Sequence, residues 1–299
     1  MEQGLRARPR RLPLAPLREL GAHRIFIDAC RAPEYYLARA ERDIAASQAP
    51  EIVGQLPGQV ALVTVGPASS ISLQPLVHAL GPRLAGLHAV PAAALDQADG
   101  GWSRSYGYLP AALAPRPAGA GPQSLRGSED ARLYLWLGSD AGFVKQRRLP
   151  DHLRRLRAAM GPADRLLLGI DLHKDGRALE AAYNDKRGQL ARIHRAELER
   201  VNTELGADFA PHQFRYRARF EPIGGRVRLE LVSRRAQTVW LEDLALEVKL
   251  GYCEAIRLGT AQIYAAGDLA SMGRVSGLGL EYQWFDARRQ YSLNLYAPR

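Results

Sequence analysis

The run Val60-Ala61-Leu62-Val63-Thr64-Val65, closed by Gly66, decides the fold of this chain. It is short and almost wholly apolar, which is typical of a strand that is buried on both faces of a parallel sheet. A helical segment follows at about residues 72–80, and residues 84–90 are the next expected strand. The chain therefore enters a strand–turn–helix–strand unit at residue 60.

Strand and helix patterns continue beyond a Pro/Gly/Ala-rich stretch at residues 110–127, which we predict to be a loop. Residues 132–137 and 165–172 are two further apolar runs of the length expected for strands. Between them, apolar residues recur at helical spacing, at Leu149, Leu153, Leu156 and Met160. This alternation favours a parallel sheet with helices on both faces.

The last two expected strands pair differently. Residues 278–284 and 291–295 alternate apolar and polar side chains and are joined by the short turn Ala287-Arg288-Arg289. A connection of this length requires antiparallel pairing. The predicted fold class is therefore α/β, a parallel sheet finished by a C-terminal antiparallel hairpin, which is the arrangement of Rossmann-like methyltransferases.

Residues 189–231, which precede this hairpin, do not show the alternation of buried strands and helices. We predict a long helix at residues 189–205, followed by two alternating runs, residues 214–220 and 226–231, around the turn Ile223-Gly224-Gly225. Each run places apolar side chains on one face and mostly arginines on the other. We interpret the basic face as the solvated face of a half-buried sheet rather than as a site for an anionic partner.

Composition limits the classes of function. The chain has 299 residues, of which 46% are hydrophobic, enough for a full core. Its net charge of +10 would suit an acidic partner. However, no nucleic-acid motif with an aromatic platform is visible, so the sequence does not favour such a partner. No apolar run approaches the length that a membrane helix needs.

Cysteine use and the N-terminal residues add two expectations. Cys30 and Cys253 lie far apart, and the histidines show no metal-ligand spacing, so we expect neither a disulfide framework nor a metal site. This use of cysteine suits a reducing, cytoplasmic location. Residues 1–20 are rich in arginine and proline, and we predict that they form a basic, disordered arm.

Several ordered motifs carry a resemblance to a known family. They are Pro33-Glu34-Tyr35-Tyr36 with Arg39-Ala40-Glu41, the run from Gly169 to Asp175, Ala182-Tyr183-Asn184-Asp185, the run from Val201 to Phe209, and the run from Leu231 to Gln237. From about residue 32 to residue 299, the chain resembles the S-adenosylmethionine-dependent histidine Nα-methyltransferases of ergothioneine biosynthesis.

The resemblance implies a domain organisation and a place for the site. It implies an inserted α+β substrate-type domain at residues 21–55 plus 180–262, and a Rossmann-like methyltransferase domain at residues 56–179 plus 263–299. The active site would lie in the cleft between them, at the carboxyl ends of the parallel strands. S-adenosylmethionine would be the cofactor, and a small amine or amino acid the substrate.

The family's cofactor turn, Gly-Ser-Gly-Thr-Ser-x-Lys, falls on Gly66 to Ser72 with several changes. Gly66 is retained, but Pro67 removes an N–H donor and Ala68 replaces the second glycine. The family's ribose-binding acid falls on Ala89, and its lysine falls on Ser72. The remaining candidates for cofactor binding are Gly66, Ser69 and Ser70, with Asp140 as a replacement acid.

The expected substrate contacts are changed as well. Tyr35 and Tyr183 match the family's two substrate-site tyrosines, although a buried tyrosine also has an ordinary packing role. The family's asparagine falls on Phe143, and its Glu-x-Ser pair falls on Gly259 and Ala261. Each lost charge-assisted hydrogen bond is worth about 1.5–3 kcal/mol, so the family's own ligands would bind less tightly.

Three hypotheses remain open on this sequence. The first is a divergent family member that is a non-catalytic partner subunit or that uses the same cleft for another ligand. The second is an active N-methyltransferase that acts on a different amino acid or amine, because methyl transfer depends mainly on proximity and orientation. The third, which rests on charge alone, is an anion-binding protein.

Overall fold

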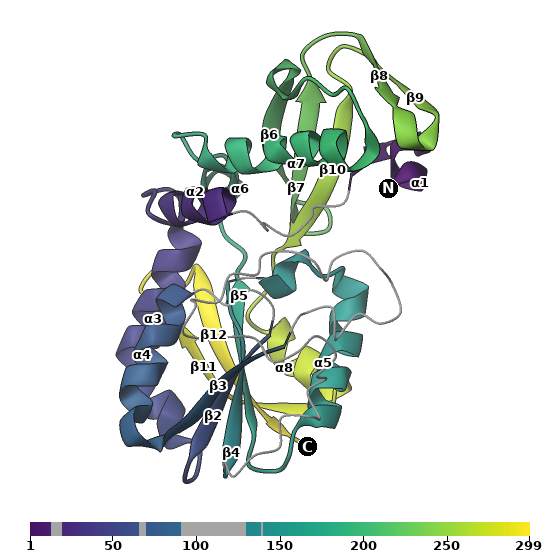
Figure 1. Cartoon of the computed structure of the whole chain (residues 1–299). Helices are drawn as coiled ribbons and strands as arrows, with labels where there is room; N and C mark the ends of the chain where they lie inside the picture. Colours follow the sequence, from purple (N-terminus) through teal and green to yellow (C-terminus); the bar gives the residue numbers. More distant parts are fainter. Residues whose placement is uncertain (13–19, 66–69, 91–129, 139) are drawn as a thin grey trace. The chain divides into compact units, whose positions relative to one another are not determined.

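The chain forms two compact units in the computed structural model, which describes residues 1–12, 20–65, 70–90, 130–138 and 140–299 (Figure 1). The sheet unit comprises Tyr36–Lys174 and Gln262–Arg299, and the insert unit comprises Met1–Tyr35 and Asp175–Ala261. The sequence had assigned residues 21–55 to the substrate-type domain. The structure instead divides the chain at Tyr35 and Tyr36, so residues 36–55 belong to the sheet unit.

The sheet unit is built on six strands in the order β11-β12-β5-β4-β2-β3. Four strands are parallel: β2 (Val60–Val65), β3 (Leu84–Val90), β4 (Ala131–Trp136) and β5 (Arg165–Asp171). The C-terminal pair, β11 (Leu278–Phe285) and β12 (Tyr291–Pro298), is antiparallel, and β12 also runs antiparallel to β5. This topology confirms the predicted Rossmann-like sheet with its C-terminal hairpin.

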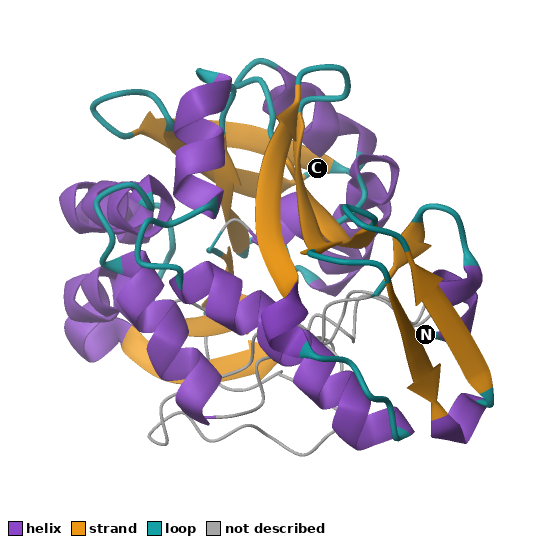
Figure 2. Ribbon diagram, turned by 90° about the horizontal axis from the view of Figure 1, so that it is seen from above, coloured by secondary structure: helices purple, strands orange, loops and turns teal. Residues whose placement is uncertain are grey.

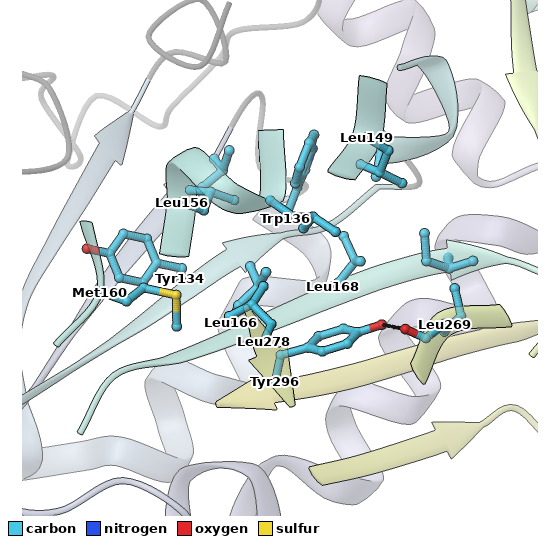
Figure 3. Close-up of a cluster of buried hydrophobic side chains, with 14 of the residues drawn as sticks. Tyr134, Trp136, Leu149, Leu156, Met160, Leu166, Leu168, Leu269, Leu278 and Tyr296 are labelled. Carbon is cyan, nitrogen blue, oxygen red and sulfur yellow. Dashed lines mark hydrogen bonds between the residues drawn. The ribbon is translucent and has the colours of Figure 1, made fainter. Parts of the chain in front are cut away.

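Helices cover both faces of this sheet. Helices α3 (Tyr36–Gly54) and α4 (Ser70–Leu80) pack together on one side, and α5 (Leu149–Ala159) and α8 (Asp268–Val275) lie on the other (Figure 1). The α5 and α8 side contains a continuous apolar core, in which the hydroxyl of Tyr296 donates to the Leu269 carbonyl at 3.0 Å (Figure 3). Three short 3-10 turns, η1 (Gly81–Arg83), η4 (Asp140–Phe143) and η5 (Gln146–Arg148), complete the unit as described.

The insert unit mixes helices and strands, as the predicted α+β domain requires (Figure 2). Its larger sheet has the order β1-β10-β7-β6, with β1 (Arg10–Arg11), β6 (Phe214–Glu221), β7 (Arg226–Ser233) and β10 (Ala255–Gln262). A separate hairpin is made by β8 (Gln237–Leu241) and β9 (Leu246–Leu250). The remaining elements are α1 (Glu2–Arg6), α2 (Leu20–Cys30), α6 (Gly176–Tyr183), α7 (Gln189–Leu205), η6 (Pro211–Gln213) and η7 (Glu242–Leu244).

The predicted disordered arm is wrong for its first part. Residues 2–6 form α1, and Arg10 and Arg11 pair in parallel with β10. Arg10 is buried, and its charge is compensated there: the guanidinium donates to the Lys249 carbonyl at 2.7 Å and pairs with Glu254 at 3.0 Å. These acceptors take the place of water around an arginine that the sequence alone assigned to solvent. Residues 13–19 lie outside the described part of the chain.

Candidate functional site

The carboxyl ends of the parallel strands meet at one edge of the six-stranded sheet. In open α/β sheets, this edge is where ligands bind. Three residues at the ends of these strands offer polar groups: the Ser72 hydroxyl in the first turn of α4 after β2, the Gly138 N–H after β4, and the Asp171 carboxylate at the end of β5. Two groups of buried polar side chains gather on these positions, one around Glu41 and one around Asp171.

Glu41 on α3 is only 1% exposed, yet its carboxylate is fully engaged. Oε1 accepts a hydrogen bond from the Ser72 hydroxyl at 2.7 Å. Oε2 accepts one from the Gly138 N–H at 2.7 Å and another from the Tyr291 hydroxyl. Burial raises the pKa of Glu41, and these donors oppose that rise because each of them stabilises the charged carboxylate.

Asp140 lies beside this group, on η4 directly after the β4 segment. The residue as a whole is half-buried, but its Oδ2 is buried and has no hydrogen-bond partner among the described residues. Burial raises the pKa of Asp140 well above its ordinary value, and the negative charge of Glu41 raises it further. Because donors surround Glu41 and not this oxygen, we assign the charge to Glu41 and the proton to Asp140.

The second group ties the end of β5 to the start of α3. Asp171 Oδ1 accepts from the Tyr36 hydroxyl at 2.6 Å and from the Lys174 ammonium, which also donates to the Tyr36 hydroxyl at 2.6 Å. The ammonium lies 4.5 Å from the centroid of the Tyr36 ring. Burial raises the pKa of Asp171 and lowers that of Lys174, and their mutual attraction opposes both shifts. Asp171 Oδ2 is buried without a hydrogen-bond partner in the described part of the chain.

The predicted cofactor residues are only partly covered by the structure. Gly66 and Ser69 lie outside the described residues, and Ser70 begins α4 but its side chain is not described. Asp140 is described at the carboxyl edge. Phe143, predicted to bind substrate, lies on the same short turn as Asp140 and is half-buried. The cofactor turn therefore stays a prediction, as do the roles of these residues.

The two predicted substrate tyrosines belong to the insert unit and are buried there. The Tyr35 ring packs edge-to-face against Phe26, with centroids 6.2 Å apart, and Tyr183 is the last residue of α6. Gly259 and Ala261 both lie on β10, and Ala261 is buried. Tyr35, Tyr183 and Ala261 are buried and Gly259 is half-buried, and the substrate role of these residues stays a prediction.

Other residues of the quoted motifs have structural partners. The Asn184 side chain accepts a hydrogen bond from the Ala218 N–H at 2.8 Å and donates one to the Ala218 carbonyl at 2.8 Å. It therefore satisfies both backbone groups of this residue of β6. Asn202 bonds both backbone groups of Phe209 in the same manner, at 2.9 and 2.7 Å. Asp185 accepts the first N–H groups of α7. These motif positions therefore shape the insert unit.

Sequence reasoning missed the central position of Glu41, which it named only as part of a motif. One signal was available: Glu41 lies within the apolar stripe of α3, between Ala40 and Ile44, where a charged residue needs a partner. The partners come from segments distant in sequence and could not be identified without the fold. Among the described residues, no group of histidine, cysteine and acidic side chains could hold a metal ion. No described helix is long and apolar enough to cross a membrane.

Comparisons with known proteins identify a family model and curated relatives that match this chain. Residues 1–298 match the family model described as histidine-specific methyltransferase, SAM-dependent. Two histidine N-alpha-methyltransferases, from Mycolicibacterium smegmatis and Mycobacterium tuberculosis, are each 28% identical to this chain, covering 98% of it and 92% of their own length. The solved structure of the sugar N-methyltransferase KedS8 from Streptoalloteichus covers 96% of both chains at 14% identity, with a TM-score of 0.44.

Proposed function

This chain belongs to the family of histidine-specific, S-adenosylmethionine-dependent methyltransferases, and on that premise we propose that it binds S-adenosylmethionine at the carboxyl edge of the six-stranded sheet. We further propose that it methylates the nitrogen of a small amine or amino acid other than histidine. The observation that carries the proposal is the buried Oδ2 of Asp140, which has no partner among the described residues.

Asp140 suits the cofactor because of where it lies and what it can donate. By the resemblance, the family's ribose-binding acid falls on Ala89, which has no carboxylate. Asp140 follows β4, a parallel strand that ends at the same edge of the sheet and is separated from β3 by β2. In its protonated form it donates one hydrogen bond and accepts others, which matches ribose hydroxyls or adenine ring nitrogens. Leaving this buried oxygen unpaired would cost about 1–3 kcal/mol, and a ligand recovers that cost.

The residues of the chain position the reactants in such a reaction and take little part in the bond-making itself. When it is bound, the sulfonium of S-adenosylmethionine supplies an activated methyl group. The protein must hold donor and acceptor in line and exclude water, and it needs no general acid for the leaving thioether. Glu41 and its hydrogen-bonded partners keep the edge of the sheet in one arrangement. Neutral Asp140 avoids placing a second negative charge beside Glu41.

The acceptor is expected to differ from histidine because three of the polar contacts expected for histidine are replaced, although Tyr35 and Tyr183 are retained. By the resemblance, the family's histidine-binding positions fall on Phe143, Gly259 and Ala261, and none of these has a hydrogen-bonding side chain. Loss of one charged hydrogen bond costs about 1.5–3 kcal/mol, which is roughly a tenfold to hundredfold loss of affinity. A less polar amine or amino acid is therefore the better match.

Two measurements on the full chain test this function. Calorimetric titration with S-adenosylmethionine should give a dissociation constant in the micromolar range. Incubation with methyl-labelled cofactor and a panel of amines and amino acids should then label at least one acceptor more rapidly than histidine. Absence of heat at millimolar cofactor would support the non-catalytic partner instead. Histidine as the most rapidly labelled acceptor would contradict the altered specificity.

A further inference from the structure

We propose that Glu41 is a positioning residue for the cofactor, because its carboxylate joins the two segments that follow the cofactor-side strands β2 and β4. This inference rests on the proposed function. It assigns to α3 the task of keeping Ser72, in the first turn of α4, and Gly138, after β4, at a fixed separation.

The segments that follow β2 and β4 are distant in sequence, and both donate a hydrogen bond to the Glu41 carboxylate. Ser72 lies in the first turn of α4, so a hydrogen bond to its hydroxyl fixes the start of the helix that follows β2. Gly138 follows β4 and leads into the turn that carries Asp140, and its φ of 79° permits the change of direction there. One carboxylate accepts from both, at 2.7 Å in each case. A shift of either segment by an ångström would break one of these bonds.

The carboxylate itself has little freedom to move. The Tyr291 hydroxyl donates to Oε2 from β12. The backbone of Gly169 approaches so closely that a Cβ there would lie 2.5 Å from Oε2. Glu41 is 1% exposed, so water does not compete for its oxygen atoms. A buried, fully bonded carboxylate of this kind holds Ser72 and Gly138 in fixed positions relative to the sheet.

Three substitutions test the positioning role. Glu41→Ala removes all the hydrogen bonds, and we expect the dissociation constant for S-adenosylmethionine to rise about tenfold or more. Glu41→Gln keeps a carbonyl for Gly138 and Tyr291, while its amide group can donate to a rotated Ser72 hydroxyl, so affinity should stay within about threefold of the wild type. Ser72→Ala breaks one connection and should weaken binding by an intermediate factor.

Tyr296→Phe is the matched control, because it deletes a buried tyrosine hydrogen bond on the other side of the sheet. It should lower the unfolding temperature without changing cofactor affinity. For an active wild type, the KM for S-adenosylmethionine should rise in Glu41→Ala and Ser72→Ala, while kcat at saturating cofactor changes little. A purely structural role would not produce this separation between KM and kcat.

The outcomes distinguish this inference from the function on which it rests. If the wild type binds no cofactor, the proposed function fails and takes the positioning role with it. If the wild type binds but Glu41→Ala and Ser72→Ala bind equally well, the positioning role alone is wrong. If Glu41→Gln is as weak as Glu41→Ala, the charge of Glu41 rather than its hydrogen bonds is responsible, and the inference is overturned. If Glu41→Ala does not fold, Ser72→Ala still decides.

Discussion

Gly169 and Glu41 are in such close contact that no larger residue fits at position 169: a Cβ would lie 2.5 Å from Glu41 Oε2. We expect Gly169→Ala to displace the buried carboxylate and to lower the free energy of unfolding by about 1–3 kcal/mol. Urea denaturation measures this change. Gly54→Ala, at the end of the same α3 helix with nothing within 4 Å, is the control. It should be neutral or stabilising by about 0.5–1 kcal/mol.

The ion pair of Asp171 and Lys174 should respond asymmetrically to substitution. Lys174→Met leaves the Asp171 carboxylate buried without its counter-ion and should cost about 3–5 kcal/mol of stability. The double variant Asp171→Asn with Lys174→Met removes both charges and should be more stable than Lys174→Met alone. A double-mutant cycle in urea measures the coupling. Strictly additive losses would show that the two charges do not stabilise each other.

His194 should make the stability of the insert unit depend on pH. Its ring stacks on Tyr216 with centroids 4.6 Å apart, and burial lowers its pKa from 6.5 to about 4. The unfolded chain therefore binds a proton between these values that the folded chain does not. Stability from this residue is complete above pH 6.5 and is lost as pH falls toward 4, by about 3 kcal/mol.

The difference between wild type and His194→Phe isolates this effect from other titrating groups. Phenylalanine retains the aromatic contact with Tyr216 and has no proton to bind. Unfolding free energies of the two proteins, measured from pH 7 to pH 4, should converge or cross as the wild type loses stability faster. Parallel pH profiles would show that His194 is protonated in the folded chain without cost.

Asp185 tests whether a motif residue of the insert unit is structural. It accepts the N–H groups of Gln189 and Leu190 at 2.7 and 2.8 Å at the start of α7. Asp185→Ala should therefore cost about 1–2 kcal/mol of stability, and Asp185→Asn less, because one oxygen acceptor remains. Cofactor affinity, measured well below the unfolding temperature, should be unchanged in both. A large loss of affinity would indicate a role beyond folding.

The strands of the sheet unit were predictable because each obeys a local rule. A strand buried on both faces is apolar at nearly every position, so residues 60–65 were identified with the bounds that β2 has. Residues 84–90 were also predicted with the bounds that β3 has, although β3 is the edge strand and is only partly buried over residues 84–88. The short connection before residue 291 required the antiparallel hairpin that β11 and β12 form.

The site was less predictable because its contacts are non-local. Glu41 meets Ser72, Gly138 and Tyr291, which no spacing rule connects. Arg10 was assigned to a disordered arm because its carbonyl acceptor belongs to Lys249, far along the chain. The sequence grouped residues 36–55 with the substrate-type domain, whereas α3 packs on α4 and β12 in the sheet unit.

The affinity of the full chain for S-adenosylhomocysteine, compared between wild type, Asp140→Asn and Asp140→Ala by calorimetry, tests the central claim most directly. A neutral Asp140 that donates to the cofactor predicts micromolar binding by the wild type and a change of no more than about threefold in Asp140→Asn, whose amide still donates. Asp140→Ala should bind about tenfold more weakly. Equal affinity in all three proteins, or no binding by the wild type, would contradict the account.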